Sequence, residues 1–225
     1  MGDSQYAPRA AVGIFGGTFD PVHYGHLRAA LEARELLKLE DFRLLPAGTP
    51  PHRSNTAGSA AHRLAMLQLA VSEYSGFRVD DREIRREGNS YMADTLREIR
   101  KETGDSPLLL IIGQDAANAL DAWHEWRAIF DLAHLVIMRR PESRLAWSGE
   151  LQSEMESRLV RNPEQLGERP AGLVLALEVT QLAISSTGIR NLLLTGRSPH
   201  FLLPGAVIDY IEQHELYFAG GARKG

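Results

Sequence analysis

The sequence contains no cysteine, which excludes several kinds of chemistry at once. Without a thiol the chain can form no disulfide, no thiolate metal site and no iron–sulfur cluster, and it has no cysteine nucleophile. A chain without cysteine suits a reducing compartment, and we expect a cytoplasmic protein.

Long hydrophobic runs and a strong charge of one sign are missing as well. The longest apolar runs are short, such as Leu108 to Ile112, whereas roughly 18 residues are needed to cross a bilayer. Residues 1–10 are polar and lack the hydrophobic segment of a secretory signal. With 25 Lys+Arg against 29 Asp+Glu, the net charge is −4, which argues against a basic nucleic-acid-binding protein. We expect neither a membrane nor a nucleic acid as a partner.

The remaining composition is that of an ordinary globular protein. Of 225 residues, 44% are hydrophobic and 24% are charged, which excludes a disordered chain. This length corresponds to one large domain, or to one domain with an appendage.

Short apolar runs alternate with stretches of helical pattern along the chain. Strands are predicted at residues 11–15, 42–46, 77–83, 108–112, 134–138 and 173–179, and helices at 25–38, 62–73, 91–101, 116–132, 151–160, 187–194 and 204–214. Continuous apolar strands are typical of parallel strands covered on both faces. The alternation predicts an α/β fold with a doubly wound, mostly parallel sheet, whose ligands bind beyond the carboxyl ends of the strands.

The domain organisation follows from these elements. We expect a Rossmann-like core over residues 11–183 and a small C-terminal helical subdomain over residues 184–217, packed on the core. Residues 1–10 and 218–225 are expected to be flexible ends.

The first candidate site is the segment GGTFDPVHYGH, residues 16–26, which follows the first predicted strand. Gly16 and Gly17 allow positive φ and a close approach of the backbone to a ligand. A helix beginning near Tyr24 offers free N–H groups to an anion, and His23 and His26 share a helical face. These features favour a phosphate site.

Other interpretations of this segment, a purely structural role or a metal site, stay open. Two glycines after a strand usually form only a turn, and a histidine at a helix start is usually a cap. Asp20, His23 and His26 could also be three metal ligands. No fourth ligand is apparent nearby, and zinc sites rarely follow a glycine loop directly, so phosphate binding is the favoured interpretation.

The second candidate site is the segment ISSTGIR, residues 184–190, after the last predicted strand. Ser185 is a natural N-cap, and Ser186 and Arg190 lie on one helical face. Hydroxyls, free N–H groups and a guanidinium suit a polyphosphate. Taken alone, however, the segment is better explained as an ordinary capped helix with a solvated arginine.

Together, the two motifs resemble those of the nucleotidylyltransferase superfamily. Its pattern Gly-x-Phe-x-Pro-x-His/Thr-x-Gly-His is met at Gly17, Phe19, Pro21, His23, Gly25 and His26, and Ile-Ser-Ser-Thr-x-x-Arg is met at residues 184–190. Within the superfamily the chain is similar to the bacterial nicotinate-mononucleotide adenylyltransferases. Further family motifs match at Pro50-Pro51-His52-Arg53, at Ser90 to Thr95, and at Gly113, Asp115, Trp123 and Trp126. Met92 departs from the threonine that is usual there.

The resemblance implies an enzyme that joins ATP and nicotinate mononucleotide to give nicotinate adenine dinucleotide and pyrophosphate. It implies catalytic roles for His23, His26 and Arg190. The ATP-binding residues it implies are Gly16, Gly17, Thr18, Phe19, His23, His26, Gly113, Asp115, Ile184, Ser185, Ser186 and Arg190. The residues it implies for the mononucleotide are Thr18, His52, Arg53, Met92, Thr95, Trp123 and His124. Met92 and His124 would give backbone N–H groups to the nicotinate carboxylate, and Trp123 would stack on the pyridine ring.

The resemblance also implies Mg²⁺ as the cofactor, bound with ATP. Mg²⁺ keeps much of its water and relies on substrate phosphates, so no metal ligand is expected from protein side chains. The sequence leaves a homo-oligomer open.

Several alternatives remain at this point. The chain could act on nicotinamide mononucleotide or on another substrate of the superfamily, or it could be a non-catalytic nucleotide sensor. Asp115 could be only a helix cap. Aromatic residues spaced three apart, such as Trp123 and Trp126, are often core residues.

Overall fold

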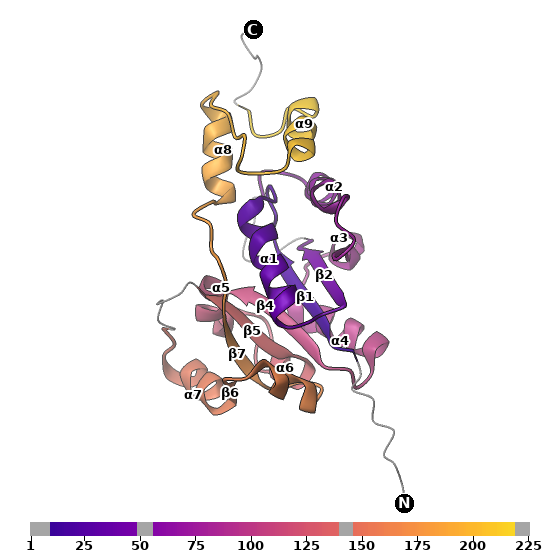
Figure 1. Cartoon of the computed structure of the whole chain (residues 1–225), viewed down its shortest axis with the longest axis vertical. Helices are drawn as coiled ribbons and strands as arrows, with labels where there is room; N and C mark the ends of the chain where they lie inside the picture. The colour runs from indigo at the N-terminus through magenta and orange to yellow at the C-terminus, as the bar shows by residue number, and fades with distance from the viewer. Residues whose placement is uncertain (1–9, 49–55, 140–145, 219–225) are drawn as a thin grey trace, which may run out of the picture. The chain divides into compact units, whose positions relative to one another are not determined.

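The computed structural model describes residues 10–48, 56–139 and 146–218, and Figure 1 labels its elements. The strands are β1 (Val12–Gly17), β2 (Asp41–Pro46), β3 (Arg78–Val79), β4 (Leu108–Gly113), β5 (His134–Arg139), β6 (Leu159–Val160) and β7 (Val174–Glu178). They form one sheet in the order β3-β2-β1-β4-β5-β7-β6. The pairings of β4 with β1 and β5, and of β7 with β5 and β6, are parallel. The predicted α/β class with a mostly parallel sheet is confirmed.

Helices separate most of the strands. The α-helices are α1 (Tyr24–Leu36), α2 (Ala60–Val71), α3 (Arg82–Arg85), α4 (Met92–Thr103), α5 (Gln114–Asn118), α6 (Ala128–Leu132), α7 (Gly149–Arg158), α8 (Ser186–Leu194) and α9 (Gly205–Gln213), and two 3₁₀ helices are η1 (Leu120–Ala122) and η2 (Pro163–Glu168). Within the described residues, no helix is long and apolar enough to cross a membrane.

The chain divides into two compact units. The first unit comprises the residues up to 15, 33–43 and 91–179, and the second comprises residues 16–32, 44–90 and those from 180 onward. The predicted division into a core of residues 11–183 and a subdomain of residues 184–217 stays a prediction.

The core of the first unit is built on the central strands. β4 and β5 have no exposed residue, and their apolar side chains are covered on both faces as predicted. In the parallel register Leu110 lies opposite both Ile14 and Leu135, and all three are fully buried. The carboxyl end of β4 leads directly into α5, which places the start of α5 at the edge where ligands bind in such sheets.

The second unit contains the loop after β1 together with helices α2, α8 and α9. α9 packs against α2 (Figure 1). Ser59 is the N-cap of α2, and its side chain accepts a hydrogen bond from the His62 N–H. Met66 and Leu67 of α2 and Val207 of α9 are fully buried.

Three predicted elements differ from the observed ones. The helix predicted over residues 116–132 is broken into α5, η1 and α6. The strand predicted over residues 77–83 is only the two-residue β3, followed by α3. The helix predicted over residues 151–160 ends at Arg158 and continues as β6.

Candidate active site

The loop after β1, in the second unit, owes its shape to Phe19 as much as to its glycines. Phe19 has a positive φ of 50°, and its side chain is only 2% exposed. A Cβ on Gly17 would lie 2.8 Å from the Phe19 ring, so glycine is needed there for close packing. Neither Gly16 nor Gly17 has a positive φ; the expectation that they supply it is wrong, because the strained residue is Phe19.

The two histidines of this loop form a tightly packed pair. Their rings stack with centroids 3.7 Å apart, and the edge of the Phe19 ring contacts His26. The backbone N–H of His23 donates to Nδ1 of His26 at 3.3 Å, so the ring proton of neutral His26 is on Nε2. Nδ1 of His23 is buried and has no hydrogen-bond partner in the described part of the chain. The described residues therefore leave the hydrogen-bonding capacity of this nitrogen unused.

Burial keeps both histidines uncharged at neutral pH. It lowers the pKa of His23 to about 4. It also lowers the pKa of His26 to about 3, and the neighbouring His23 adds to this effect. The pair can therefore offer neutral N–H donors to an anion.

The N-terminus of α1 is less open than the sequence suggested. The N–H of Tyr24 donates to the carbonyl of Leu202, and the N–H of His26 donates to the carbonyl of His23. These two N–H groups are already satisfied, so the imidazoles carry more of any phosphate binding than the helix start does.

The start of α8 has the predicted cap. Ser185 is the N-cap, and its Oγ accepts a hydrogen bond from the N–H of Gly188 at 3.1 Å. Ile189 and Leu193 are buried as expected, which leaves Ser186 and Arg190 on the other face. Ile184 precedes the cap and is partly exposed.

Hydrogen bonds join the two motifs within the second unit. Oγ of Ser186 donates to the carbonyl of Pro21 at 2.9 Å, across 165 residues of sequence. Nη1 of Arg190 donates to the carbonyl of Asp20 at 2.6 Å, and Nη2 donates to Oγ1 of Thr187. The motifs that the sequence placed at opposite ends of the chain thus meet in one cluster of donors.

Arg63 is an important residue that sequence reasoning missed. Its side chain is fully buried, and it donates to the carbonyls of Thr18 at 2.9 Å and Gly48 at 2.8 Å. Burial lowers its pKa, while Asp20 and Glu83 act in the opposite direction. Arg63 therefore fixes the backbone after β1 and after β2, and Thr18 is held through its carbonyl.

In the first unit, Gly113 and Asp115 lie at the carboxyl end of β4. Gly113 is the N-cap of α5, and a Cβ there would meet open space. Asp115 is exposed in the first turn of α5 and is not the cap. The alternative of Asp115 as a cap is wrong, and its carboxylate is free to accept from a ligand hydroxyl.

The segment carrying Trp123 and His124 contacts the N-terminus of α4, also within the first unit. The rings of Tyr91 and His124 lie 4.3 Å apart, and Arg97 of α4 forms an ion pair with Glu125. Because Met92 is the first residue of α4, its N–H has no acceptor within the helix. The ring contact therefore brings the segment with His124 close to the start of α4, and the roles of Met92 and His124 as backbone donors stay predictions.

The two tryptophans of this region differ in environment. Trp126 is 9% exposed, packs edge-on against Phe130 and lies under the Arg127 guanidinium, so it is a packing residue. Trp123 is partly exposed and follows η1 in extended conformation. Thr95 is fully buried in α4.

His52 and Arg53 lie outside the described residues, so their predicted contacts with the mononucleotide stay predictions.

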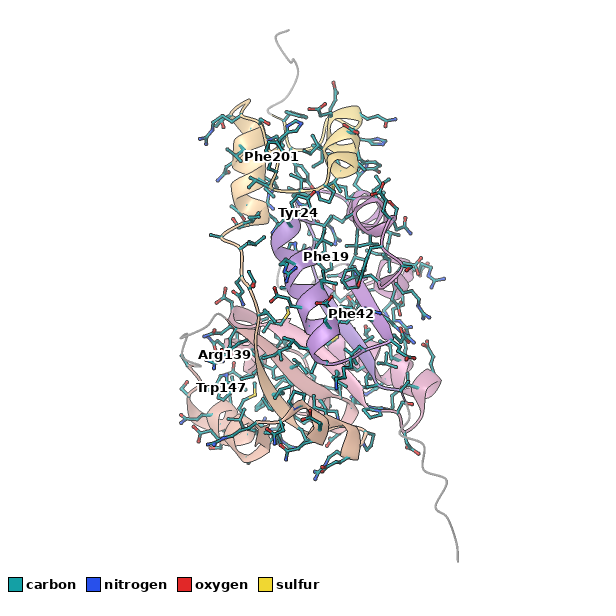
Figure 2. The ribbon with its side chains drawn as sticks, viewed as in Figure 1. Phe19, Tyr24, Phe42, Arg139, Trp147 and Phe201 are labelled. Carbon is teal, nitrogen blue, oxygen red and sulfur yellow. The ribbon has the colours of Figure 1, made fainter. Side chains whose placement is uncertain are left out.

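An apolar cavity of about 420 Å³ lies elsewhere in the second unit. Tyr24 and Phe201, both labelled in Figure 2, line it together with Leu27 and Leu31. Among the predicted site residues that the structure describes, only Ile184 lines this cavity, and neither His23 nor His26 does.

The buried histidines predict how stability depends on pH. Their folded-state pKa values lie below the ordinary 6.5, so the unfolded chain binds protons that the folded chain does not. The stabilisation is complete above pH 6.5 and is lost as the pH falls towards 4. One pKa unit corresponds to about 1.4 kcal/mol, so each of the two histidines should lower the free energy of unfolding without ligand by on the order of 3 kcal/mol over this range.

Urea titrations of the wild type and of a His23→Asn/His26→Asn variant between pH 7.5 and 4.5 measure this loss. The variant should lose less stability on acidification, whereas replacement of the exposed His200 by asparagine should leave the pH dependence unchanged. Equal pH dependence in the wild type and the double variant would contradict the assignment.

Comparison with known proteins adds an independent finding. The sequence profile described as "Cytidylyltransferase-like" matches residues 14–192. A "probable nicotinate-nucleotide adenylyltransferase" of Methylococcus capsulatus is 53% identical over 92% of this chain and 99% of that protein. Another protein of that name, from Marinobacter nauticus, is 45% identical over 92% of this chain and 96% of its own length.

A solved structure is also similar. The Plasmodium falciparum nicotinic acid mononucleotide adenylyltransferase complexed with NaAD superposes with a TM-score of 0.69 at 16% identity. The match covers 92% of this chain and 97% of that one. At this identity the similarity supports the fold.

Proposed function

Because the chain belongs to the cytidylyltransferase-like family and, within it, to the nicotinate-nucleotide adenylyltransferases, we propose that it transfers the adenylyl group of ATP to nicotinate mononucleotide. The products are nicotinate adenine dinucleotide, a precursor of NAD, and pyrophosphate. A phosphate oxygen of the mononucleotide forms a bond to the α-phosphorus of ATP. The bond from that phosphorus to the α–β bridging oxygen breaks, and pyrophosphate leaves with the electron pair.

This chemistry asks the protein for alignment and charge stabilisation. The attacking phosphate is already a nucleophile at neutral pH, so no covalent nucleophile is needed. Holding the reactants in line, with donors aimed at the developing charge, supplies the rate enhancement.

The cluster of donors in the second unit carries the proposal for ATP. The decisive observation is that the loop carrying the stacked pair of His23 and His26 is hydrogen-bonded to the start of α8 through Ser186 and Arg190. His23 and His26 bind the α and β phosphates as neutral donors. Ser185 and Ser186, at the start of α8, and Arg190 bind the β/γ end.

The remaining ATP contacts are proposed from the resemblance and from position. Gly16, Gly17, Thr18 and Phe19 form the loop against which the nucleotide lies, with Ile184 beside it. Asp115, exposed at the end of β4, accepts from ribose hydroxyls, next to Gly113.

The proposal for the mononucleotide rests on the first unit. The ring contact between Tyr91 and His124 supports a pair of backbone donors from Met92 and His124 for the nicotinate carboxylate. Trp123, partly exposed beside them, stacks on the pyridine ring. Arg53 and His52 are proposed for the mononucleotide phosphate, with Thr18, and buried Thr95 has a supporting role in α4.

Mg²⁺ is proposed as the cofactor that accompanies ATP. The described residues contain no cluster of three or more carboxylates or imidazoles that could hold a metal ion. Mg²⁺ generally keeps several waters and relies on substrate phosphates. When bound, Mg²⁺ neutralises charge on the phosphate oxygens. A cytoplasmic location and a possible homo-oligomer stay predictions.

Replacing Arg190 by alanine should weaken the binding of ATP more than the binding of the mononucleotide. Its guanidinium donates to the main-chain carbonyl of Asp20 and to the hydroxyl of Thr187. The pyrophosphate end of ATP is proposed to bind there, at the start of α8. A lost hydrogen bond to a charged group costs about 1.5–3 kcal/mol, so the KM for ATP should rise about tenfold or more. Steady-state kinetics with each substrate varied in turn test this, with Arg197→Ala, on the loop after α8, as the control. An equal rise in the KM values of both substrates in Arg190→Ala would contradict the placement of Arg190 at the pyrophosphate end of ATP.

The preference between nicotinate mononucleotide, the acid, and nicotinamide mononucleotide, the amide, tests the proposed substrate. Two convergent N–H groups match the two acceptor oxygens of a carboxylate, but one of them would face the NH₂ group of a carboxamide. A mismatch of this kind costs roughly 1–3 kcal/mol, so kcat/KM should favour nicotinate over nicotinamide mononucleotide by about tenfold or more. Equal efficiency would favour the amide-tolerant relatives, and no turnover with either would favour a nucleotide sensor.

Trp123→Ala separates stacking from this preference. Base–aromatic stacking contributes on the order of 1–3 kcal/mol and does not distinguish acid from amide. The variant should therefore raise the KM of the mononucleotide and keep the preference, while Trp147→Ala should change neither. Loss of the preference would mean that Trp123 also orders the donors.

A further inference from the structure

Asp20 is a buried carboxylate of the first motif that lies next to Arg190 of the second, and the proposed chemistry does not use it. Its side chain is held by three donors. The N–H of Ala57 donates to Oδ2 at 2.8 Å, the N–H of Gly58 donates to Oδ1 at 2.9 Å, and the hydroxyl of Tyr217 donates to Oδ1 at 2.6 Å. Asp20 is 6% exposed, so these donors replace the water that would otherwise solvate its charge.

This carboxylate lies close to the proposed phosphate-binding arginine. Nη1 of Arg190 is 3.9 Å from Oδ2 of Asp20, but its hydrogen bond goes to the main-chain carbonyl of the same residue at 2.6 Å. Arginine and carboxylate groups frequently form short, bidentate pairs, whereas this ion pair is a single long contact. A bidentate pair would draw the positive charge away from a phosphate. The three donors occupy the carboxylate, and the guanidinium stays partly exposed.

Tyr217 is the donor that comes from farthest away. It lies 197 residues from Asp20 in the sequence, after α9 and near the end of the described chain. A Cβ on Gly58 would lie 2.7 Å from the Tyr217 oxygen, so the hydroxyl occupies a slot that only glycine leaves open. Burial and the bond to Asp20 raise the pKa of Tyr217, so the hydroxyl keeps its proton and always donates.

We propose that Tyr217 is a positioning residue for the pyrophosphate end of ATP: its hydroxyl holds the Asp20 carboxylate, so that the Arg190 guanidinium remains available to phosphate oxygens. The inference rests on the proposed function, because it takes Arg190 as the ligand of that end of ATP. The C-terminal segment thereby becomes part of the nucleotide site through Asp20.

The test is Tyr217→Phe in the full chain, which removes one oxygen and keeps the ring. Without the Tyr217 hydroxyl, Oδ1 keeps only the Gly58 donor, so the carboxylate should turn towards Arg190 and shorten the present 3.9 Å approach to a hydrogen-bonded ion pair. Calorimetric titration with magnesium pyrophosphate should then show a dissociation constant raised about fivefold or more, and the KM for ATP should rise with it. The KM for nicotinate mononucleotide should stay within twofold of the wild-type value.

Tyr210→Phe is the matched control. Tyr210 also comes from the C-terminal segment, in α9, and its hydroxyl lies 3.0 Å from Nδ1 of His62 and not at Asp20. This variant should leave pyrophosphate affinity and both KM values unchanged.

Two results would overturn the inference. One is an unchanged pyrophosphate affinity in Tyr217→Phe. The other is an equal weakening of pyrophosphate and the mononucleotide together with a lowered melting temperature, which a purely structural role would give. Calorimetry measures pyrophosphate binding without turnover, so it tests the role of Tyr217 even if the wild type makes no dinucleotide. A wild type that makes no dinucleotide would reject the proposed function.

Discussion

His26→Ala should lower kcat by about 10²–10³ while the protein stays folded. The loss of one preorganised donor to a developing charge typically has an effect of this size. His26 is suited to that role because its Nδ1 accepts from the His23 backbone, which leaves Nε2 as the donor, and because its ring is fixed between Phe19 and His23. Single-turnover rates at saturating ATP measure the chemical step, and circular dichroism confirms that the variant is folded.

The matched control for this experiment is His200→Ala. His200 is an exposed histidine of the same unit that contacts the Ser198 hydroxyl, and its removal should leave kcat unchanged. A folded His26→Ala variant with near-normal kcat would show that the histidine pair does not bind the reacting phosphates.

Arg63→Ala should produce the largest loss of stability, about 3–5 kcal/mol. The substitution leaves the carbonyls of Thr18 and Gly48 buried without a donor, and it opens a cavity where the side chain is fully buried. Breaking a buried charged network costs about this much. Arg63→Lys keeps the charge but cannot reach both carbonyls with a planar fork, so it should fall between alanine and the wild type.

Urea unfolding at pH 7.5 measures both Arg63 variants against Arg85→Ala. Arg85 forms an ion pair with Asp81, but its side chain is 72% exposed, and exposed pairs contribute at most about 1 kcal/mol. A loss for Arg63→Ala no larger than that for Arg85→Ala would contradict the structural role of this residue.

The sheet could be predicted from sequence because its strands are simple. β4 and the middle of β5, Leu135 to Met138, are uninterrupted apolar runs, and in the structure they are buried. The capped helix after the last strand was also predictable, since Ser185 provides the cap.

The helix predicted over residues 116–132 failed because tertiary contacts override local propensity. The spacing of its apolar residues suits one continuous helix. In the structure the chain turns extended at Trp123 and takes a positive φ of 50° at Glu125. Two contacts stabilise this break in the helix: the ring of Tyr91 packs on the ring of His124, and Arg97 forms an ion pair with Glu125. Both partners are distant in sequence, so no local pattern reveals them.

The strand predicted over residues 77–83 failed for a local reason that a closer reading could have found. The Asp80 carboxylate accepts from the backbone N–H and the guanidinium of Arg82. This arrangement begins α3 immediately after β3. The N-cap position of α3 is Asp81, whose side chain makes no capping hydrogen bond, and two successive aspartates disfavour a strand.

The residues of the candidate site also fall into two groups, those that local sequence indicates and those that only folded contacts reveal. His23, His26, Ser186 and Arg190 stand in contiguous motifs, so the sequence alone indicates them as candidates, and hydrogen bonds join the two motifs in the structure. Arg63 stands in a helix, where an arginine is usually solvated, and Tyr217 stands near the C-terminus with no motif around it. Their roles depend on folded contacts with Thr18 and Asp20, which the sequence does not display.

The central claim is nucleotidyl transfer at the α-phosphorus of ATP, and the fate of a radiolabel tests it most directly. Purified protein is incubated with nicotinate mononucleotide, Mg²⁺ and ATP labelled at either the α or the γ phosphorus, and the products are separated by chromatography. The account predicts that the α label appears in nicotinate adenine dinucleotide and the γ label in pyrophosphate, in equal amounts. Transfer of the γ label to the mononucleotide, or no transfer of either label, would contradict it.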